Sequence, residues 1–287
     1  MNWLKDFIRP KIKSIFRKKT SESDEKTLWE KCPSCTQIIY ISELKENFFV
    51  CPQCDYHLRI NALDRLSITF DSSEYENIKI KNVSFDPLKF VDSKKYKERF
   101  QEAKKTSGDD EACRVAYGSI RGIMATVVAH SFSFMGGSLG SYVGEAIVTA
   151  ANKAIESHSP LIIFSSSGGA RMQEGAFSLM QLPRTTVGIK KVKDAGLPYI
   201  SCLCDPCYGG PSASYAMLGD IHIAEPGANI GFAGKRVIEQ TIRETLPEKF
   251  QTAEYLFKKG YIDMVIHRKK MKEELFKILS LLLKKKI

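Results

Sequence analysis

Residues 161–174, LIIFSSSGGARMQE, constrain the fold of this chain more than any other stretch. The four apolar residues 161–164, followed by a serine run, are the pattern of a short buried strand. Gly168 and Gly169 then allow a tight turn and a close backbone approach, and helical texture begins at Ala170. Such a turn can aim several backbone N–H groups at one point, which suits an oxyanion or a phosphate.

Arg171 falls in the first turn of the expected helix, where the helix dipole makes a cation mildly unfavourable. Its presence there predicts an acidic ligand nearby. A plain strand-to-helix turn with a surface arginine is an equally good interpretation of this segment alone. The apolar face of the helix is expected to comprise Met172, Phe177, Leu179, Met180 and Leu182.

Two further segments repeat the pattern of an apolar strand, a glycine pair and a helix. Gly136 and Gly137 precede a helix-like run in residues 134–151, and Gly209 and Gly210 precede another in residues 199–218. Three such units in succession predict a stacked α/β repeat whose turns place backbone donors along one edge.

Four cysteines near the N-terminus form the strongest local motif. Cys32 and Cys35 are separated by two residues, as are Cys51 and Cys54. Two such knuckles can hold one structural zinc ion in a closed tetrahedral four-sulfur site. The alternative is four reduced cysteines with no metal. Residues 38–44 and 47–50 are expected to be the strands of a small ribbon, which depends on the metal for much of its stability.

A second cysteine group is interpreted as part of the apolar core and not as a metal site. Cys202 and Cys204 alternate along an expected strand, Cys207 follows in a loop, and His222 is the only candidate fourth ligand within reach. Buried cysteines that pack as small apolar residues are favoured over a second metal site. The sequence contains no Ser-His-Asp order, HExxH or Walker loop, so it offers no obvious side-chain nucleophile or base.

Charge and cysteine content limit which ligands and which cellular compartment we expect for the chain. Lys and Arg outnumber Asp and Glu by 43 to 33, a formal charge of +10 that attracts nucleic acid, acidic lipid or a multiply phosphorylated cofactor. Eight cysteines without a signal peptide indicate a reducing, cytoplasmic environment. No apolar run is long enough for a membrane span.

The chain divides into three expected parts. Residues 1–27 are expected to form a basic arm and linker, residues 28–60 the zinc ribbon, and residues 61–287 the core domain. A loosely ordered arm is favoured over a basic amphipathic surface helix, because Pro10 would break the helix early. Within the core domain, residues 94–105 indicate an exposed helix, and residues 271–287 a C-terminal helix that packs on the core.

Several long motifs carry a family resemblance. The cysteine quartet is followed in order by FVDSKKY, FMGGSLGSYVG, SSSGGARMQEG, LPYISCLCDP, GGPSASYAMLGDIHIAEPGANIGFAG and RVIEQT. Together they resemble the beta subunits of the bacterial-type acetyl-CoA carboxylase carboxyltransferase, from about residue 28 to about residue 268. Lys235 and the pair Cys207-Tyr208 depart from the family pattern, which affects loop detail only.

The resemblance implies a crotonase-like (ClpP/crotonase) α/β fold, a repeated ββα superhelix preceded by a zinc ribbon. It implies carboxyl transfer to acetyl-CoA, giving malonyl-CoA for fatty acid synthesis, from carboxybiotin on the biotin carboxyl carrier protein. The implied partners are an alpha subunit, in an alpha2beta2 heterotetramer, and biotin carboxylase. In this chemistry the biotin enolate left by CO2 release takes the acetyl proton, so the protein needs oxyanion donors rather than a catalytic histidine.

The resemblance also assigns candidate residues. Gly168, Gly169, Ala170, Gly209 and Gly210 would border the oxyanion site, Arg171, Gly136 and Gly137 would contact substrate, and the quartet would hold one structural zinc ion. The rival interpretation is a zinc-ribbon nucleic-acid-binding protein, whose binding would be mainly electrostatic and non-specific. A purely structural scaffold subunit is a third.

Overall fold

The computed structural model describes residues 28–284; the expected basic arm, residues 1–27, lies outside this range, as do residues 285–287. Within it, the core is a seven-stranded mixed sheet in the order β3-β4-β5-β6-β7-β8-β9. The first three strands pair antiparallel, and β5 to β9 pair parallel. The strands are β3 (Tyr75–Asn77), β4 (Cys113–Ile120), β5 (Ile123–His130), β6 (Leu161–Ser167), β7 (Tyr199–Cys207), β8 (Ile221–Ala224) and β9 (Met264–Val265).

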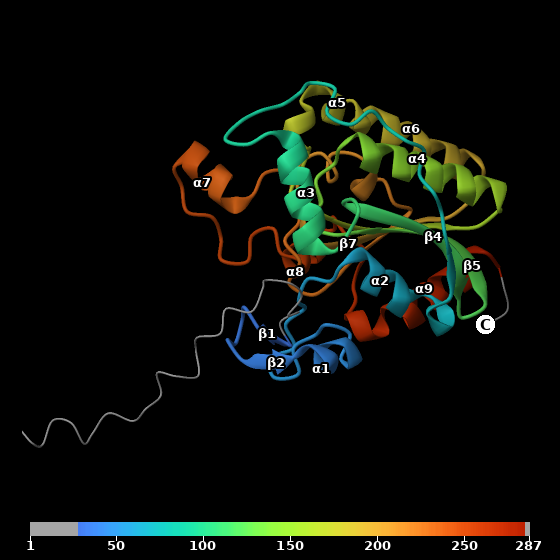
Figure 1. Ribbon diagram of the computed structural model, residues 1–287. Coiled ribbons are helices and arrows are strands. Elements are labelled where there is room, and N and C mark those ends of the chain that lie inside the picture. The colour runs from blue at the N-terminus through green and yellow to red at the C-terminus, as the bar shows by residue number, and fades with distance from the viewer. Residues whose placement is uncertain (1–27, 285–287) are drawn as a thin grey trace, which may run out of the picture.

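Helices cover both faces of this sheet (Figure 1). On one side lie α4 (Ser141–Glu156) and α6 (Gln181–Asp194), and on the other α2 (Ala62–Thr69) and α9 (Arg268–Leu282). The expected exposed and C-terminal helices are therefore present, as α3 (Tyr96–Ser107) and α9. The remaining α-helices of the described chain are α5 (Ala176–Leu179), α7 (Lys235–Ile242) and α8 (Ala253–Lys258) outside the ribbon, and α1 (Ile41–Glu46) within it.

Strand β6 is buried along its whole length, as its apolar run predicts. Leu161 and Ile163 point into the core beneath α4, whereas Ile162 and Phe164 point into the core beneath α2 and α9. Strand β7 divides in the same way, and its Cys202 and Cys204 pack in the second core. The prediction that these cysteines behave as small apolar residues is consistent with this packing.

The prediction that a helix directly follows each glycine pair is only partly right. The chain after Ala170 forms a short 3-10 helix (Met172–Glu174) and is then interrupted at Gly175, whose φ of 50° ends the turn before α5 and α6 begin. After Gly210 only a 3-10 turn forms (Tyr215–Met217), because the backbone leaves the helical region at Ser214, whose φ is −139° and ψ is −122°. Helix α4 does follow Gly137, after a three-residue gap.

Of the predicted apolar face after Ala170, only Leu182 packs against the core. Met172, Phe177 and Met180 are 64%, 47% and 63% exposed. Because such large apolar side chains normally seek burial, this surface is a candidate for covering by another molecule.

The N-terminal ribbon pairs β1 (Trp29–Lys31) with β2 (Ile38–Tyr40) and lies against the end of the core near α2 and α9 (Figure 1). Residues 41–44, the second half of the predicted strand 38–44, lie in helix α1 (Ile41–Glu46) instead, since the apolar pair Ile41 and Leu44 has helical spacing. The predicted strand 47–50 is also wrong, because this segment is a turn that ends in an isolated bridge between Val50 and His57. The small core beneath α1 includes Ile39, Leu44 and Leu58.

A buried ionic junction fixes the ribbon to the core. Arg268, at the start of α9, donates to the backbone carbonyls of Phe48, Phe49 and Leu58 in the ribbon at 3.2, 3.1 and 2.9 Å. Its guanidinium also pairs with Glu225 at 2.5 Å, and Arg65 pairs with the same carboxylate at 2.7 Å. Burial alone would raise the pKa of Glu225, but the two guanidinium groups hold this pKa well below its usual range.

Candidate functional site

The three glycine pairs meet at the carboxyl ends of the neighbouring parallel strands β5, β6 and β7. The N–H of Gly168 donates to the Gly136 carbonyl, and the N–H of Leu139 donates to the Gly169 carbonyl, both at 2.8 Å. The N–H of Tyr208 donates to the Ser167 carbonyl at 2.8 Å and brings the third loop beside the second. The expectation that successive turns line one edge is therefore confirmed by the backbone hydrogen bonds.

Only glycine permits this loop packing at two of the positions. Gly137 has a φ of 61°, and a Cβ there would lie 2.1 Å from the Ser166 carbonyl oxygen. Gly209 has a φ of 64°, and a Cβ there would lie 3.0 Å from the Gly169 Cα. The loops are thus in direct backbone contact, which side chains at these positions would prevent.

The hydrogen bonds show which backbone N–H groups of the second and third glycine loops already have an acceptor. Gly168 donates to Gly136, Gly169 to the Ser167 hydroxyl at 3.2 Å, and Gly209 to the Phe232 carbonyl at 2.8 Å. Within residues 28–284, no acceptor lies within hydrogen-bonding reach of the N–H groups of Ala170 and Gly210. These two donors are neighbours, because a Cβ on Gly210 would lie 3.6 Å from the Ala170 nitrogen.

An open hollow of about 570 Å³ lies over the second glycine pair. Its floor is formed by residues 168–173 and its sides by Gly136, Ser138 and the Arg99 face of α3. Among residues 28–284, no histidine lines this hollow. The buried His130 bonds the Tyr215 hydroxyl at 3.1 Å, and burial lowers the pKa of its imidazole to about 4. The site thus offers backbone donors and lacks a histidine base.

Arg171 is placed differently from the sequence-based expectation. Its side chain is 1% exposed and lies in a buried cluster of polar side chains. The guanidinium donates to Glu111 at 3.0 Å, to the Tyr96 hydroxyl at 3.1 Å and to the Ser138 hydroxyl at 3.1 Å. Burial alone would lower the pKa of Arg171, but the Glu111 carboxylate raises it above its usual range. The acidic partner that the motif predicts is therefore within the chain, and direct contact with substrate does not follow from this geometry.

The Arg171 cluster supports the loops from behind. Glu174 accepts a hydrogen bond from the Tyr96 hydroxyl at 2.9 Å and another from the Ser141 N–H, at the start of α4, at 2.6 Å. The cluster therefore ties α3, the start of β4, the first glycine loop and the second glycine loop together. Sequence reasoning missed Glu111 and Glu174, because Glu111 is 60 residues from Arg171 and neither lies in a metal-like or catalytic spacing.

The cysteine quartet has the geometry of a zinc site. The four sulfur atoms of Cys32, Cys35, Cys51 and Cys54 lie within 4.8 Å of one another, with contacts of 3.6 and 3.7 Å across the two knuckles. A tetrahedral ion with Zn–S bonds of about 2.3 Å requires sulfur atoms roughly 3.8 Å apart. The residues fit one structural zinc ion with no open position for a substrate.

Loss of one ligand is expected to remove the metal. Cys51→Ser should reduce bound zinc from one per chain to near zero and unfold the ribbon, since zinc binding in such modules contributes about 10–16 kcal/mol. Metal analysis of the purified chain by mass spectrometry checks this, with Cys113→Ser, in the core, as the control that keeps its zinc. Folded wild-type chain without zinc would contradict the assignment.

Comparisons with known proteins agree with this architecture. The carboxyl transferase domain family matches residues 76–254, and the acetyl-CoA carboxylase zinc finger domain family matches residues 29–54. Among solved structures, transcarboxylase 12S with hydrolysed methylmalonyl-coenzyme A bound is 25% identical, with a TM-score of 0.63 over 77% of this chain and 41% of that one. The Pseudomonas malonate decarboxylase hetero-dimer shares the fold at 21% identity, with a TM-score of 0.60 over 77% of this chain and 86% of that one. The fold and the glycine loops therefore define a crotonase-like carboxyl transferase.

Curated relatives show to which family of carboxyl transferases the chain belongs. The acetyl-coenzyme A carboxylase carboxyl transferase subunit beta of Afipia carboxidovorans is 51% identical over 99% of this chain and 90% of its own length. That of Dinoroseobacter shibae is 50% identical over 99% and 88%. The chain belongs to the family of acetyl-CoA carboxylase carboxyl transferase beta subunits. These matches support carboxyl transfer and not the nucleic-acid-binding alternative.

Proposed function

We propose that the chain, with an alpha-type partner subunit, transfers the carboxyl group of carboxybiotin to acetyl-CoA and forms malonyl-CoA. Carboxybiotin, made by biotin carboxylase and presented on the biotin carboxyl carrier protein, supplies the CO2 and accepts the methyl proton. The chain's own contribution is to hold the thioester and to stabilise the negative charge that develops on its oxygen. The paired free donors of Ala170 and Gly210 carry this proposal.

The two donors would act together on one oxygen. Each preorganised N–H of an oxyanion site typically contributes ~3–4 kcal/mol to transition-state stabilisation. Gly168, Gly169 and Gly209 hold the loops in register through their own hydrogen bonds, so their N–H groups serve the geometry and not the oxyanion. Gly136 and Gly137 support the second loop from the other side, and Gly136 also lines the hollow.

Exposed apolar surface around the site supports a partner subunit. Phe232, whose carbonyl holds Gly209, is 72% exposed, and Met172, beside the second glycine loop, is 64% exposed. Helix α7 projects from the core (Figure 1) and has no buried residue. On the outer side of α6, a groove of about 580 Å³ is lined by Met180, Pro183 and Val187. A partner of the same fold class, in an alpha2beta2 assembly, would cover this surface and complete the cleft.

The assembly is expected to work in the cytoplasm. Four cysteines that bind zinc need a reducing compartment to stay as thiolates. Within the described range, no helix is long and apolar enough to cross a membrane.

Product formation tests the proposal. Purified chain mixed with the alpha-type partner, carboxylated carrier protein and acetyl-CoA is expected to form malonyl-CoA, measured by chromatography of the CoA esters. The chain without its partner is expected to be inactive, because it supplies one half of the cleft. Robust malonyl-CoA formation by the chain alone would refute the shared site, and no product from the complete mixture would refute the function.

A further inference from the structure

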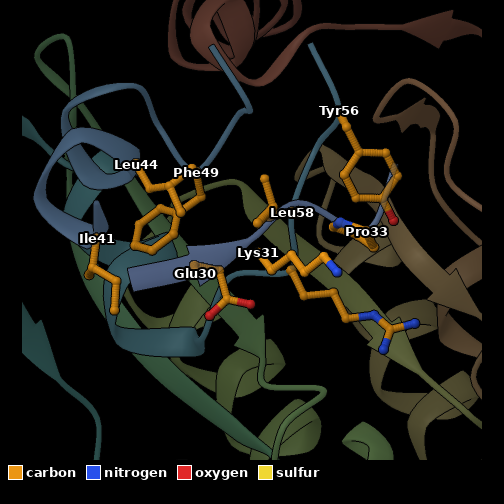
Figure 2. A pocket seen from close by; sticks show the side chains of 9 residues that line it. Glu30, Lys31, Pro33, Ile41, Leu44, Phe49, Tyr56 and Leu58 are labelled. Atoms are coloured by element: carbon orange, nitrogen blue, oxygen red, sulfur yellow. The ribbon is translucent and has the colours of Figure 1, made fainter. Parts of the chain in front are cut away.

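The ribbon carries a hollow of its own, separate from the one over the glycine loops. It measures about 440 Å³, within the range of small-molecule sites. Figure 2 shows Ile41, Leu44 and Phe49 together on one side and Tyr56 on the other, with the Lys31 side chain between them. One end of the hollow is therefore apolar and can receive a flat ring.

Two cations line the same hollow. Lys31 has no carboxylate within salt-bridge distance in the described part of the chain. Arg59 meets the Asp205 carboxylate at only 3.4 Å, and its side chain stays 54% exposed. Glu30 offsets one of these charges, so the lining keeps a net positive charge. The hollow suits a ligand with an apolar ring and more than one anionic group.

The position of Arg59 connects this hollow to the glycine loops. Its guanidinium carbon lies 4.2 Å from the centroid of the Phe132 ring. The same ring has its Cε2 atom 3.9 Å from the place of a Cβ on Gly168. A single aromatic side chain thus forms the ridge between the ribbon hollow and the second glycine pair.

We infer that the ribbon hollow binds the nucleotide end of the CoA thioester. The adenine ring would lie against Phe49 and Leu44, and the phosphates would be held by Lys31 and Arg59, with the pantetheine arm crossing the Phe132 ridge to the glycine loops. This inference rests on the proposed function, since it assumes that the thioester end is held at Ala170. It gives the zinc ribbon a direct part in substrate binding.

Substrates with and without the nucleotide test the inference in the complete complex. Arg59→Gln and Lys31→Gln are each expected to raise the KM for acetyl-CoA roughly tenfold, since a hydrogen bond to a charged group contributes about 1.5–3 kcal/mol. The KM for acetyl-pantetheine, which lacks the nucleotide, and kcat for both substrates should stay unchanged. Lys45→Gln removes an equal charge from α1 outside the hollow and is expected to change nothing. Zinc content is measured in each variant, because Lys31 adjoins Cys32.

Equilibrium dialysis of the isolated wild-type and variant chains supplies a readout that does not depend on turnover. Both hollow variants should lose affinity for CoA and for adenosine 3′,5′-bisphosphate by a similar factor, and pantetheine should bind all chains equally. A loss of affinity for adenosine 3′,5′-bisphosphate alone, with CoA binding unaffected, would mean a free-nucleotide site and overturn the inference. Equal KM changes for acetyl-CoA and acetyl-pantetheine would also overturn the inference. A loss of oligonucleotide binding with CoA binding unaffected would overturn it as well. If wild-type complex carboxylates neither thioester, the proposed function fails, and the dialysis still decides whether the hollow binds the nucleotide.

Discussion

Gly169→Val is expected to lower kcat for malonyl-CoA formation by at least about 10²–10³-fold, the cost of losing one oxyanion donor. Gly169 has a φ of 134°, which a β-branched residue does not adopt without strain. Relief of that strain rotates the peptide that carries the neighbouring Ala170 N–H. Turnover of the complex with the alpha-type partner measures the effect. Zinc content and solubility should stay close to those of wild type, because the ribbon lies in a separate part of the chain.

The matched control is Gly122→Val. Gly122 also has a positive φ, 85°, and no atom lies within 4 Å of the place of its Cβ. It turns the chain between β4 and β5, at the opposite end of β5 from the glycine loops. This variant should lose some stability through backbone strain but keep its kcat. Full activity of Gly169→Val, or equal losses in both variants, would contradict the oxyanion assignment.

Glu225→Gln is expected to lower the free energy of unfolding by about 3–5 kcal/mol, the usual effect of removing one partner from a buried ionic group. The change leaves the guanidinium groups of Arg65 and Arg268 buried without a carboxylate. Because Arg268 also binds three ribbon carbonyls, the ribbon should detach from the core before the core unfolds. Urea unfolding of zinc-loaded protein measures the stability, and limited proteolysis between the ribbon and α2 measures the detachment.

The control for this change is Glu102→Gln, which removes an exposed ion pair with Lys94 and should cost at most about 1 kcal/mol. The pH dependence gives a second check. Since the pKa of Glu225 is lowered in the folded protein, its contribution is complete above the unfolded value of about 4.3 and declines as the pH falls below it. Unchanged stability of Glu225→Gln at neutral pH would show that the junction does not hold the ribbon.

Local patterns in the sequence predict the parts of the fold that depend on local chemistry. The run 161–164 identifies β6 correctly, because a strand buried on both faces must be apolar at every position. The glycine pairs identify the loops, because close backbone contact excludes side chains. The quartet spacing identifies the metal site, because two knuckles fix four sulfur atoms.

The failures arise where distant residues decide the outcome. Arg171 lies beside the glycine loop in sequence, but its long side chain turns inward to Glu111 on another element. The apolar face after Ala170 predicts burial against the core, but Met172 and Met180 are exposed. Apolar spacing alone does not distinguish a face that packs on the chain's own core from one that stays on the surface. The junction of Arg268 with Glu225 brings together residues with no shared motif. Its role follows only from the three-dimensional packing.

The central claim is that the free N–H groups of Ala170 and Gly210 bind the thioester oxygen. A crystal structure of the complex between this chain and its alpha-type partner, with a stable ketone analogue of acetyl-CoA, tests it directly. The ketone analogue places an oxygen where the thioester carbonyl lies. The oxygen is expected within about 2.7–3.1 Å of the Ala170 and Gly210 nitrogens, the distance of an oxyanion-site donor. A well-ordered analogue whose oxygen contacts neither nitrogen would contradict the account.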